Sequence, residues 1–314
     1  MDNTQSSKDI DSKEFGKVAV VYGGHSNERP VSIMSGEAVL EALQNEGIDA
    51  HKFDPKEQDI LNLRDYDRVF NVLHGRGGED GELQGLLDWL NIPQTGSGVL
   101  ASALAMDKIR TKQVWLGCGI EQTAPFTMLT ADSDWQQIVN AIGLPLVVKP
   151  VHEGSSIGIS IVKTLDELAE AYHKAADCGD IVMAEKFIDG KEFSIVIIDD
   201  EAYPVIGCQP ADDAAFYDFD AKYVREDTAF FIPCGLDETQ ESQLQHLCLQ
   251  AFRAVGASGW GRVDAMQDKA GNFWLLEINT VPGMTTHSFV PMAAKARGMG
   301  FETLCVHILA QTLS

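Results

Sequence analysis

Positive charge is scarce in this chain. Its 314 residues include 24 Lys and Arg against 47 Asp and Glu, which gives a formal net charge of −23. Proteins that coat nucleic acid need clustered Lys and Arg to neutralise phosphates, so this balance argues against a nucleic-acid partner. A well-solvated acidic surface explains most of the excess. Any site for a phosphate-bearing ligand must therefore gather its few cations locally.

Long apolar runs and paired cysteines are also missing. No apolar stretch approaches the ~20 residues that a membrane-spanning helix needs, and the polar opening residues lack the apolar core of a signal peptide. We therefore expect a cytoplasmic protein that has no membrane partner and begins with a disordered leader over residues 1–16. Scattered cysteines without a CxxC pair are typical of reduced thiols; they are Cys118, Cys178, Cys208, Cys234, Cys248 and Cys305.

The first hundred residues alternate strand and helix signals. The β-branched run KVAVVY ends at a Gly-Gly pair, and further apolar runs follow a helical stretch that stops near Asn45. This rhythm predicts a parallel sheet covered by helices, with strands over 17–22, 48–53 and 68–73 and a later helix over 82–90. Ligands of such sheets bind at the carboxyl ends of the strands, where the loops 23–29 and 74–81 fall.

The length of the chain predicts more than one folded part. We expect an N-terminal α/β domain over 17–107, a central part over 108–189 and a C-terminal part over 190–314. The stretch 209–232 lacks a clear periodicity, and loops of that length in compact domains are usually functional or disordered. Its several aromatic residues favour a lid, because disordered tracts are poor in aromatics.

Two apolar runs near the C-terminus, 259–267 and 273–278, are separated by a turn with Gly271 and Asn272, which predicts a β-hairpin. Asp264 and Glu277 then lie on adjacent strands, and Asn279 shares the face of Glu277 because strand side chains alternate. Two carboxylates and an amide oxygen suit a hard cation such as Mg²⁺. The alternative is a pair of water-exposed edge charges. Arg262, on the face of Asp264, favours a phosphate site.

Two further stretches have the chemistry of a nucleotide site. Lys149 ends a predicted strand and precedes the small residues EGSSIG, whose backbone N–H groups can approach an anion, although a plain hairpin turn is the alternative. A strand end that leads into a hinge supplies the apolar wall and backbone groups that a purine needs. The candidates there are Glu185, Lys186, Phe187, Ile188 and, for ribose hydroxyls, Glu192. Without context, ordinary core and surface positions are the favoured interpretation of these residues.

Eight strings in a fixed order identify a family. From about Lys17 to its end the chain resembles the ATP-grasp superfamily and, within it, the D-alanine–D-alanine ligases of peptidoglycan synthesis. The strings are GGHSNER, LHGRGGEDGELQG, GSGVLASALAMDK, VVKPVHEGSSIG, EKFIDGKEF, FYDFDAKY, GWGRVD and LLEINTVPGMTTHS. The resemblance implies an α/β fold in which a parallel-sheet domain precedes a two-part α+β ATP-grasp domain. It also implies that ATP phosphorylates one D-alanine, and that a second attacks the D-alanyl phosphate to give D-alanyl-D-alanine, ADP and phosphate.

The resemblance further implies a role for each matching residue around ATP. Lys108 and Lys149 would hold the α- and β-phosphates, and Lys222 in the lid would reach the γ-phosphate. Glu185, Lys186, Phe187, Ile188 and Glu192 would line the nucleotide site. Two Mg²⁺ or Mn²⁺ ions would bind Asp264, Glu277 and Asn279, while Arg262 and the backbone N–H of Gly283 would stabilise the tetrahedral oxyanion.

For the two D-alanine molecules, the resemblance implies that Glu28 pairs with the ammonium of the first and that His74 lies beside it. Ser288 and Lys222 would bind the carboxylate of the second, with Phe289 at its methyl group. Tyr223, Ser155 and Glu28 would form a hydrogen-bonded trio that ties down the lid and excludes water. Members of the family are commonly homodimers. The departures from the family pattern are Pro30, His152 and Val281.

Two other functions fit the same strings. A D-alanine–D-lactate ligase would use the same machinery to form an ester, but Tyr223 argues against it because several ester-forming relatives lack that residue. A non-catalytic nucleotide-binding protein of this fold would be expected to have lost acidic residues or Arg262, and all of them are present. The dipeptide ligase is therefore the function that the sequence predicts.

Overall fold

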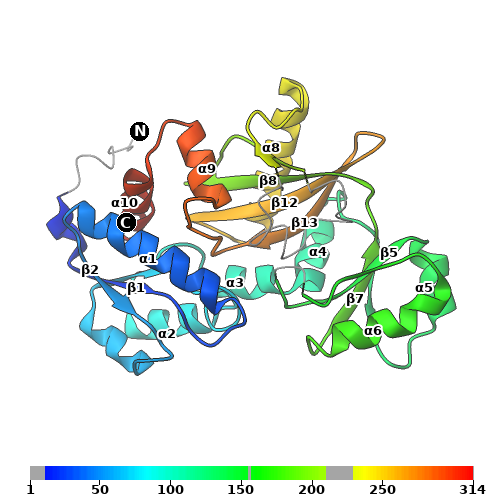
Figure 1. Cartoon of the computed structure of the whole chain (residues 1–314), viewed down its shortest axis with the longest axis horizontal. Coiled ribbons are helices and arrows are strands. Elements are labelled where there is room, and N and C mark those ends of the chain that lie inside the picture. The colour runs from blue at the N-terminus through cyan, green and yellow to red at the C-terminus, as the bar shows by residue number, and fades with distance from the viewer. Residues whose placement is uncertain (1–10, 155–156, 210–228, 314) are drawn as a thin grey trace.

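The computed structural model describes residues 11–154, 157–209 and 229–313, and this part of the chain builds three sheets. A parallel sheet lies at one end of the molecule and a four-stranded sheet at the other, with the largest sheet between them (Figure 1). The predicted mixed α/β architecture is therefore confirmed. No helix of these described ranges is long and apolar enough to cross a membrane.

The N-terminal sheet is parallel, as predicted, with the order β2-β1-β3. Its strands are β1 (Lys17–Val21), β2 (Asp49–Phe53) and β3 (Arg68–Asn71). Val18 and Val20 pack into a core with α1 (Arg29–Asn45), while Ala19 and Val21 pack on the opposite side with α2 (Glu82–Leu90). Both faces are therefore buried, which explains the continuous apolar run of β1. The short 3₁₀ helix η3 (Ile60–Asp65) leads into β3.

Residues 11–16 differ from the predicted disordered leader. Ser12–Phe15 form a 3₁₀ helix, η2, which the side chain of Asp11 caps by accepting the Lys13 N–H. Phe15 is buried, and its carbonyl oxygen accepts a hydrogen bond from Arg68 Nε at 2.5 Å. The prediction is wrong for these residues because one large apolar side chain anchors them to the core. Residues 1–10 lie outside the described ranges.

Two helices connect the N-terminal sheet to the rest of the chain. They are α3 (Val99–Met106) and α4 (Lys108–Gly117). Asp107 between them has an extended backbone, and its carboxylate caps α4 by accepting the Arg110 N–H at 2.9 Å. This break makes Lys108 the first residue of α4.

The central sheet is antiparallel with the order β4-β7-β5-β6. One layer of helices packs on it, formed by α5 (Trp135–Ile142) and α6 (Leu168–Ala176), with the 3₁₀ helix η4 (Leu165–Glu167) before α6. The strands are β4 (Phe126–Leu129), β5 (Leu146–Pro150), β6 (Ser160–Val162) and β7 (Val182–Lys186). β7 leads through 187–189 directly into the largest sheet.

The largest sheet is antiparallel, with the order β11-β10-β8-β12-β13 and β9 paired to β8. Its strands are β8 (Gly190–Ile198), β9 (Glu201–Ala202), β10 (Ile206–Gln209), β11 (Ala229–Phe231), β12 (Trp260–Asp268) and β13 (Phe273–Asn279). The predicted hairpin of β12 and β13 is confirmed. Most of the predicted lid, residues 210–228, lies outside the described ranges.

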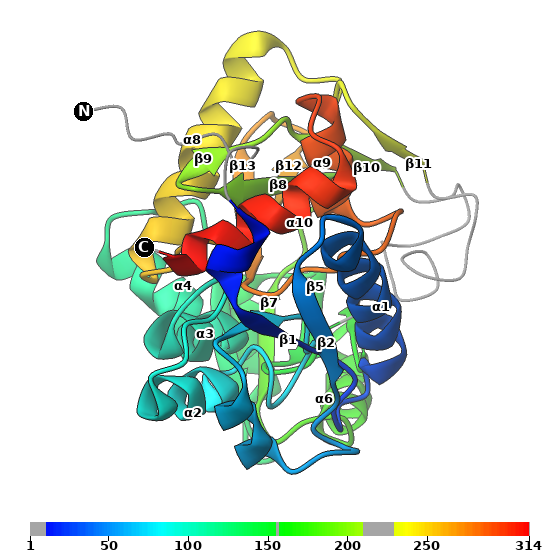
Figure 2. The same ribbon diagram turned by 90° about the vertical axis from the view of Figure 1, so that its left-hand side faces the viewer.

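Helices cover both faces of this sheet. Phe193, Ile195 and Ile197 of β8 pack with α8 (Glu238–Ala254), whereas Val196 and Ile198 face the opposite core. That opposite core also contains residues of α9 (Phe289–Ala296), α10 (Phe301–Ala310) and α1. Figure 2 shows α10 between the N-terminal helix α1 and the large sheet. One apolar core thus joins the N-terminal and C-terminal parts, and the 3₁₀ helix η5 (Gln311–Leu313) follows it.

Candidate active site

The register of β12 and β13 gathers the predicted metal ligands. Arg262 lies opposite Asn279, and Asp264 lies opposite Glu277. Residues that face each other in an antiparallel pair share a face, and so do residues two apart on one strand. All four side chains therefore lie on one face of the sheet, as the alternation in the sequence predicts.

Asp264 is the buried member of this group, and hydrogen bonds hold both of its oxygens. Arg262 donates from Nε to Oδ1 at 2.8 Å and from Nη2 to Oδ2 at 2.7 Å. Ser194 on the neighbouring strand β8 donates its hydroxyl to Oδ1 at 2.5 Å, and Asn279 Nδ2 donates to Oδ2 at 3.4 Å. The bidentate contact fixes the plane of the carboxylate and of the guanidinium.

The donor chemistry of this group fits a hard divalent cation. Asp264, Glu277 and Asn279 supply carboxylate and amide oxygens on a shared face, and such oxygens are the ligands that Mg²⁺ prefers. Among the described residues, no three His, Cys, Asp or Glu side chains form a metal-binding group by themselves. A Mg²⁺ ion here therefore needs Asn279 or the phosphate oxygens of a ligand to complete its coordination.

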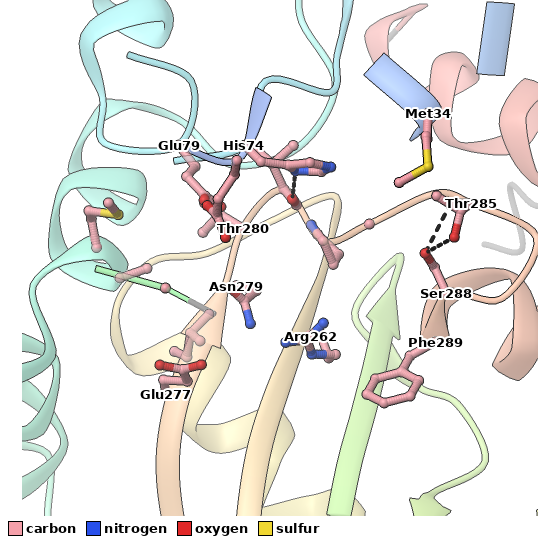
Figure 3. Close-up of a pocket in the computed structure, with 18 of the residues that line it drawn as sticks. Met34, His74, Glu79, Arg262, Glu277, Asn279, Thr280, Thr285, Ser288 and Phe289 are labelled. Carbon is pink, nitrogen blue, oxygen red and sulfur yellow. Dashed lines mark hydrogen bonds between the residues drawn. The ribbon is translucent and has the colours of Figure 1, made fainter. Parts of the chain in front are cut away.

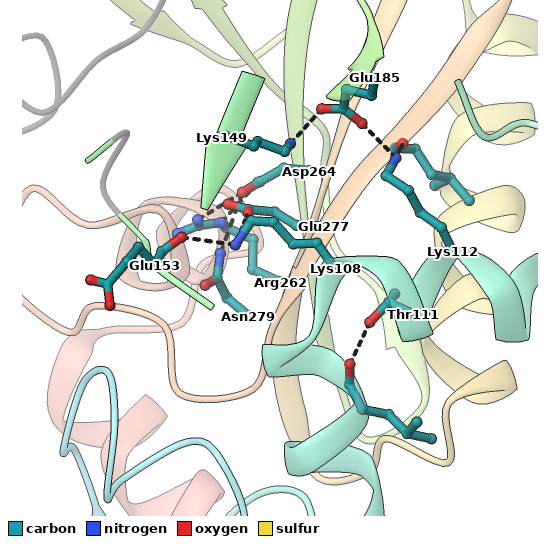
Figure 4. A network of polar contacts seen from close by, with 12 residues as sticks. Lys108, Thr111, Lys112, Lys149, Glu153, Glu185, Arg262, Asp264, Glu277 and Asn279 are labelled. Carbon is teal, nitrogen blue, oxygen red and sulfur yellow. Dashed lines mark hydrogen bonds and ion pairs between the residues drawn. The ribbon is translucent and has the colours of Figure 1, made fainter. Parts of the chain in front are cut away.

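Lys108 brings a cation to the same place. As the first residue of α4, it directs Nζ to the carbonyl oxygen of Glu153 at 2.9 Å and to Glu277 Oε2 at 3.2 Å (Figure 4). The ammonium thus lies between the EGSSIG loop and a predicted metal ligand. The loop and Glu277 are both predicted to face the phosphates of a ligand. The ammonium of Lys108 lies between them and can therefore neutralise a phosphate bound there.

Lys149 and Glu185 belong to a second, deeper cluster. Lys149 at the end of β5 forms an ion pair with Glu185 Oε1, and Lys112 on α4 lies 3.0 Å from Oε2 (Figure 4). Burial alone would raise the pKa of Glu185, but the two lysines outweigh it and lower this pKa to about 2. The carboxylate therefore stays ionised although it is buried.

A cavity of about 460 Å³ opens beside the β12–β13 face. Met34 and His74 border it on one side, and Glu277, Arg262 and Ser288 border it on the other (Figure 3). Nine of the predicted site residues line it, namely Glu28, His74, Lys108, Arg262, Glu277, Asn279, Gly283, Ser288 and Phe289. Asp264 lies behind Arg262 and is not among its lining residues. The sequence thus predicts part of the cavity wall.

Glu28 precedes the first residue of α1, so its carboxylate lies at the positive end of the helix. The side chain of Glu28 does not cap the helix, and Ser26 nearby donates its hydroxyl to the His74 carbonyl oxygen at 2.6 Å. A Cβ atom on Gly154 would lie 3.0 Å from Glu28 Oε1, and one on Gly75 would lie 3.1 Å from Oε2. Glycines on two distant loops therefore leave room for this carboxylate.

His74 is buried at the carboxyl end of the parallel sheet. Its Nδ1 lies 2.8 Å from the Val281 carbonyl oxygen, and its Nε2 lies 3.2 Å from Ser35 Oγ. Burial lowers the pKa of His74, so the neutral imidazole is favoured near pH 7. Nδ1 is then the protonated nitrogen, since a carbonyl oxygen can only accept.

Glu79 also lines the cavity, and the sequence analysis assigns it no role although it stands in the string LHGRGGEDGELQG. The Gly75 N–H donates to its Oε1 at 2.6 Å. Burial and, to a smaller extent, the charge of Glu28 raise the pKa of Glu79 to about 8. Its position four residues after Gly75 in a tight glycine-rich turn is the signal that would have identified it.

The opposite wall is formed by the loop before α9. Ser288 Oγ accepts the Thr285 N–H at 3.0 Å, and a Cβ atom on Gly283 would lie only 2.9 Å from the same oxygen. Gly283 is therefore required by close packing. Phe289, the first residue of α9, lies under the Arg262 guanidinium at 5.4 Å and makes an edge contact with Phe230. Phe289 thus packs against both Arg262 and Phe230 at the cavity wall.

The other predicted residues lie elsewhere or outside the described ranges. Lys186 donates from Nζ to the Leu144 carbonyl oxygen at 3.1 Å, and Phe187 and Ile188 are half-buried in the connection from β7 to β8. Glu192 lies on β8, opposite Met266 and Cys208. None of these four lines the cavity described above. Ser155, Lys222 and Tyr223 lie outside the described residues.

Comparison with known proteins agrees with this geometry. A family model described as the D-ala D-ala ligase C-terminus matches residues 114–310, and one for the N-terminus matches residues 49–97. A D-alanine–D-alanine ligase of Psychrobacter sp. (strain PRwf-1) is 73% identical over 299 residues, covering 95% of this chain and 90% of the relative. One of Acinetobacter baylyi is 59% identical, covering 96% and 97% respectively.

Solved structures show the same similarity in three dimensions. A D-alanine–D-alanine ligase from Bacillus anthracis superposes with a TM-score of 0.81 at 31% identity, covering 95% of this chain and 97% of the other. The structure of that ligase complexed with ATP gives a TM-score of 0.82 at 30% identity, with the same coverage. The matches extend over both ends of the cavity and over all three sheets. This chain belongs to the D-alanine–D-alanine ligase family.

Proposed function

We propose that this protein is an ATP-dependent ligase that joins two D-alanine molecules into D-alanyl-D-alanine for peptidoglycan synthesis. One observation carries the proposal. Glu28 and Ser288, from nearly opposite ends of the chain, line the same cavity as Lys108, Arg262 and Glu277. Groups suited to an ammonium and a carboxylate thus lie beside groups suited to phosphoryl transfer.

The chemistry requires both sets of groups. A carboxylate is a poor electrophile, so ATP first transfers its γ-phosphoryl group to the carboxylate of one D-alanine and leaves as ADP. The amine of the second D-alanine then attacks the acyl carbon, and phosphate is expelled as the peptide bond forms. Positioning and charge neutralisation account for most of the catalysis of such a transfer.

Two residues are suited to the negative charge that develops in the second step. Arg262 is held in place by the carboxylate of Asp264 and by the ring of Phe289. The backbone N–H of Gly283 is the second proposed donor to the tetrahedral oxyanion. Because Arg262 is fixed before substrate binds, it needs little reorganisation during the reaction.

At the amino-acid end, we assign Glu28 to the ammonium of the first D-alanine and His74 to its immediate surroundings. The neutral imidazole of His74 leaves Glu28 as the main charge for that ammonium. Ser288 is assigned to the carboxylate of the second D-alanine and Phe289 to its methyl group. Lys222, Tyr223 and Ser155, in the proposed lid and its partner loop, complete the water-excluding closure in this proposal.

At the nucleotide end, we assign Lys108 and Lys149 to the phosphates. The purine and ribose are assigned to the connection between β7 and β8, with Glu185, Lys186, Phe187, Ile188 and Glu192. Two Mg²⁺ or Mn²⁺ ions would be held by Asp264, Glu277 and Asn279, and would neutralise the phosphate charge. The proposed parts 17–107, 108–189 and 190–314 then each contribute one wall of the site.

A product assay tests the proposal directly. Purified protein is incubated with ATP, Mg²⁺ and D-alanine, and both ADP and the dipeptide are quantified by chromatography and mass spectrometry. We expect equal amounts of ADP and D-alanyl-D-alanine, and loss of both when the metal is chelated. L-alanine is the matched control and should release no ADP above background. Phosphate release with L-alanine but not with D-alanine would overturn the proposal.

The same assay separates the two other functions. With D-alanine and D-lactate offered together, D-alanyl-D-lactate as the main product would identify an ester-forming enzyme. Binding of ATP without any ADP formation would identify a non-catalytic nucleotide-binding protein. We also propose a cytoplasmic homodimer, which light scattering coupled to size-exclusion chromatography tests; a monomeric mass at micromolar concentration would contradict that part alone.

A further inference from the structure

Lys112 is a buried charged residue that does not line the cavity and has no role in the proposed reaction. It lies one turn after Lys108 on the same side of α4, and its side chain is 0% exposed. Its Nζ lies 3.0 Å from Glu185 Oε2 and donates to the Leu275 carbonyl oxygen at 3.3 Å. Lysine is almost never fully buried unless it is paired. This position therefore calls for an explanation.

The charges of the cluster do not cancel. Lys112 and Lys149 carry two positive charges against the single negative charge of Glu185, so the three side chains have a net charge of +1. A buried net charge is costly unless a counter-charge approaches it. Burial is the main cause that lowers the pKa of Lys112, and Lys149 lowers it further. The cluster is therefore suited to receive an anion.

Only one of the two lysines can reach that anion. Lys112 is sealed between α4, β7 and β13, whereas the side chain of Lys149 is 9% exposed and follows β5 towards the EGSSIG loop. Figure 4 shows Glu185 between the two ammonium groups, with Lys112 on the side of the helix α4. If Lys149 turns towards a phosphate, Lys112 remains as the partner of Glu185.

We propose that Lys112 is a positioning residue for ATP: it neutralises Glu185 from the buried side and so leaves Lys149 available to the phosphates. This proposal rests on the proposed ATP-dependent function. Lys112 itself touches no substrate and acts through Glu185. Without Lys112, Glu185 has Lys149 as its remaining ion-pair partner among the described residues, and the net charge offered to a phosphate falls from +1 to zero.

The test is the affinity for ATP in four variants. Lys112→Met should raise the KM for ATP, and the Kd for ATP measured by calorimetry, about tenfold. The KM for D-alanine should stay within about twofold, because the charge that is lost serves the nucleotide. Arg110→Met, which removes an exposed cation from the same helix, is the matched control and should leave both constants unchanged.

The decisive variant is Lys112→Met combined with Glu185→Gln. A neutral glutamine no longer competes for Lys149, so the double variant should bind ATP more tightly than Lys112→Met alone. In a Glu185→Gln background, adding Lys112→Met should change the KM for ATP by less than about twofold. This comparison remains valid if Lys112→Met alone fails to fold, since neither of its members carries the Glu185 carboxylate.

Two outcomes would overturn the proposal. One is a double variant that binds ATP no better than Lys112→Met, or that binds ATP about tenfold more weakly than Glu185→Gln. The other is a parallel rise in the KM values for ATP and D-alanine, which a purely structural role predicts. Failure of the proposed function appears differently, as wild-type protein that binds ATP but forms no dipeptide; the Kd comparison then still decides the role of Lys112.

Discussion

Two lysine–glutamate pairs lie one turn apart on the same helix, yet they differ in depth. Lys108 Nζ is 3.2 Å from Glu277 Oε2, with side chains that are 10% and 22% exposed. Lys112 Nζ is 3.0 Å from Glu185 Oε2, with side chains that are 0% and 5% exposed. The chemistry of the two pairs is the same, so burial alone separates their properties.

This difference in depth decides what each pair can do. The Lys108–Glu277 pair borders the cavity, where a ligand can replace either partner and compensate the charge that is released. The Lys112–Glu185 pair has no such replacement, because water and ligand do not reach Lys112. The outer pair is therefore suited to binding and catalysis, and the inner pair to holding a fixed charge.

The pKa values of two acidic groups, Glu185 in the inner pair and Glu79 at the cavity, are shifted in opposite directions. The lysines lower the pKa of Glu185 to about 2, so the stability it contributes is present above its usual value of 4.5 and is lost as the pH falls towards 2. Burial and Glu28 raise the pKa of Glu79 to about 8. The stability linked to Glu79 is therefore present at low pH and is lost as the pH rises to 8.

The largest expected effect is on stability, in Lys112→Met. Removing one member of a buried ion-pair cluster costs up to about 3–5 kcal/mol of unfolding free energy, because Glu185 Oε2 loses its cation and Lys149 remains as the partner of Oε1. Urea unfolding at pH 7 measures it. The isosteric double variant Lys112→Met/Glu185→Gln should recover most of the loss. A loss below about 1 kcal/mol would show that Lys149 alone compensates the charge of Glu185 and that Lys112 is not needed for stability.

Glu277→Gln should have the opposite effect, with a large loss of activity and little loss of stability. We expect kcat to fall about 10²–10³-fold, equivalent to roughly 2.7–4 kcal/mol of transition-state stabilisation, because a charge beside the transferred phosphoryl group is lost. The midpoint of unfolding should change little, since Lys108 can still reach the cavity and its water. Steady-state kinetics with a thermal melt checks both. Full activity in a folded variant would remove Glu277 from the proposed metal ligands.

Glu79, which lines the cavity, should make the stability of the protein depend on pH. Between about pH 4.5 and pH 8 the folded protein keeps a proton on Glu79 that the unfolded chain has released. Unfolding free energy of the wild type, relative to Glu79→Gln, should therefore decrease as the pH rises through this window. Urea titrations of both proteins at several pH values measure the difference. Parallel curves would show that Glu79 is ionised at neutral pH in the folded state.

The sequence predicts the surroundings of the outer pair, Lys108 and Glu277, better than those of the inner pair, Lys112 and Glu185. Alternation along β12 and β13 places Asp264, Glu277 and Asn279 on one face, and the structure confirms that face. The parallel N-terminal sheet follows from the same local periodicity. These features are predictable because strand alternation and turn chemistry act over a few residues.

Long-range contacts explain what the sequence does not predict. Lys112 stands in the polar stretch KIRTKQ, which is typical of a solvated helix face, and its burial depends on Leu275, 163 residues away. Phe15 is anchored by Arg68 in the same way. The break between α3 and α4 is different, because the Asp107 cap is a local signal.

The smallest effect is expected at an exposed ion pair on the surface. Lys269 forms an ion pair with Asp189 between the β12–β13 turn and the β7–β8 connection, and the two side chains are 78% and 65% exposed. Because water screens both charges, Lys269→Ala should change the unfolding free energy by no more than about 1 kcal/mol and leave kcat unchanged. High salt should reduce the change in unfolding free energy caused by Lys269→Ala still further. It should affect Lys112→Met much less, because salt screens a buried pair weakly. Urea unfolding at low and high ionic strength compares the two variants. If Lys269→Ala destabilises the protein as much as Lys112→Met, burial is not what distinguishes these lysine–carboxylate pairs.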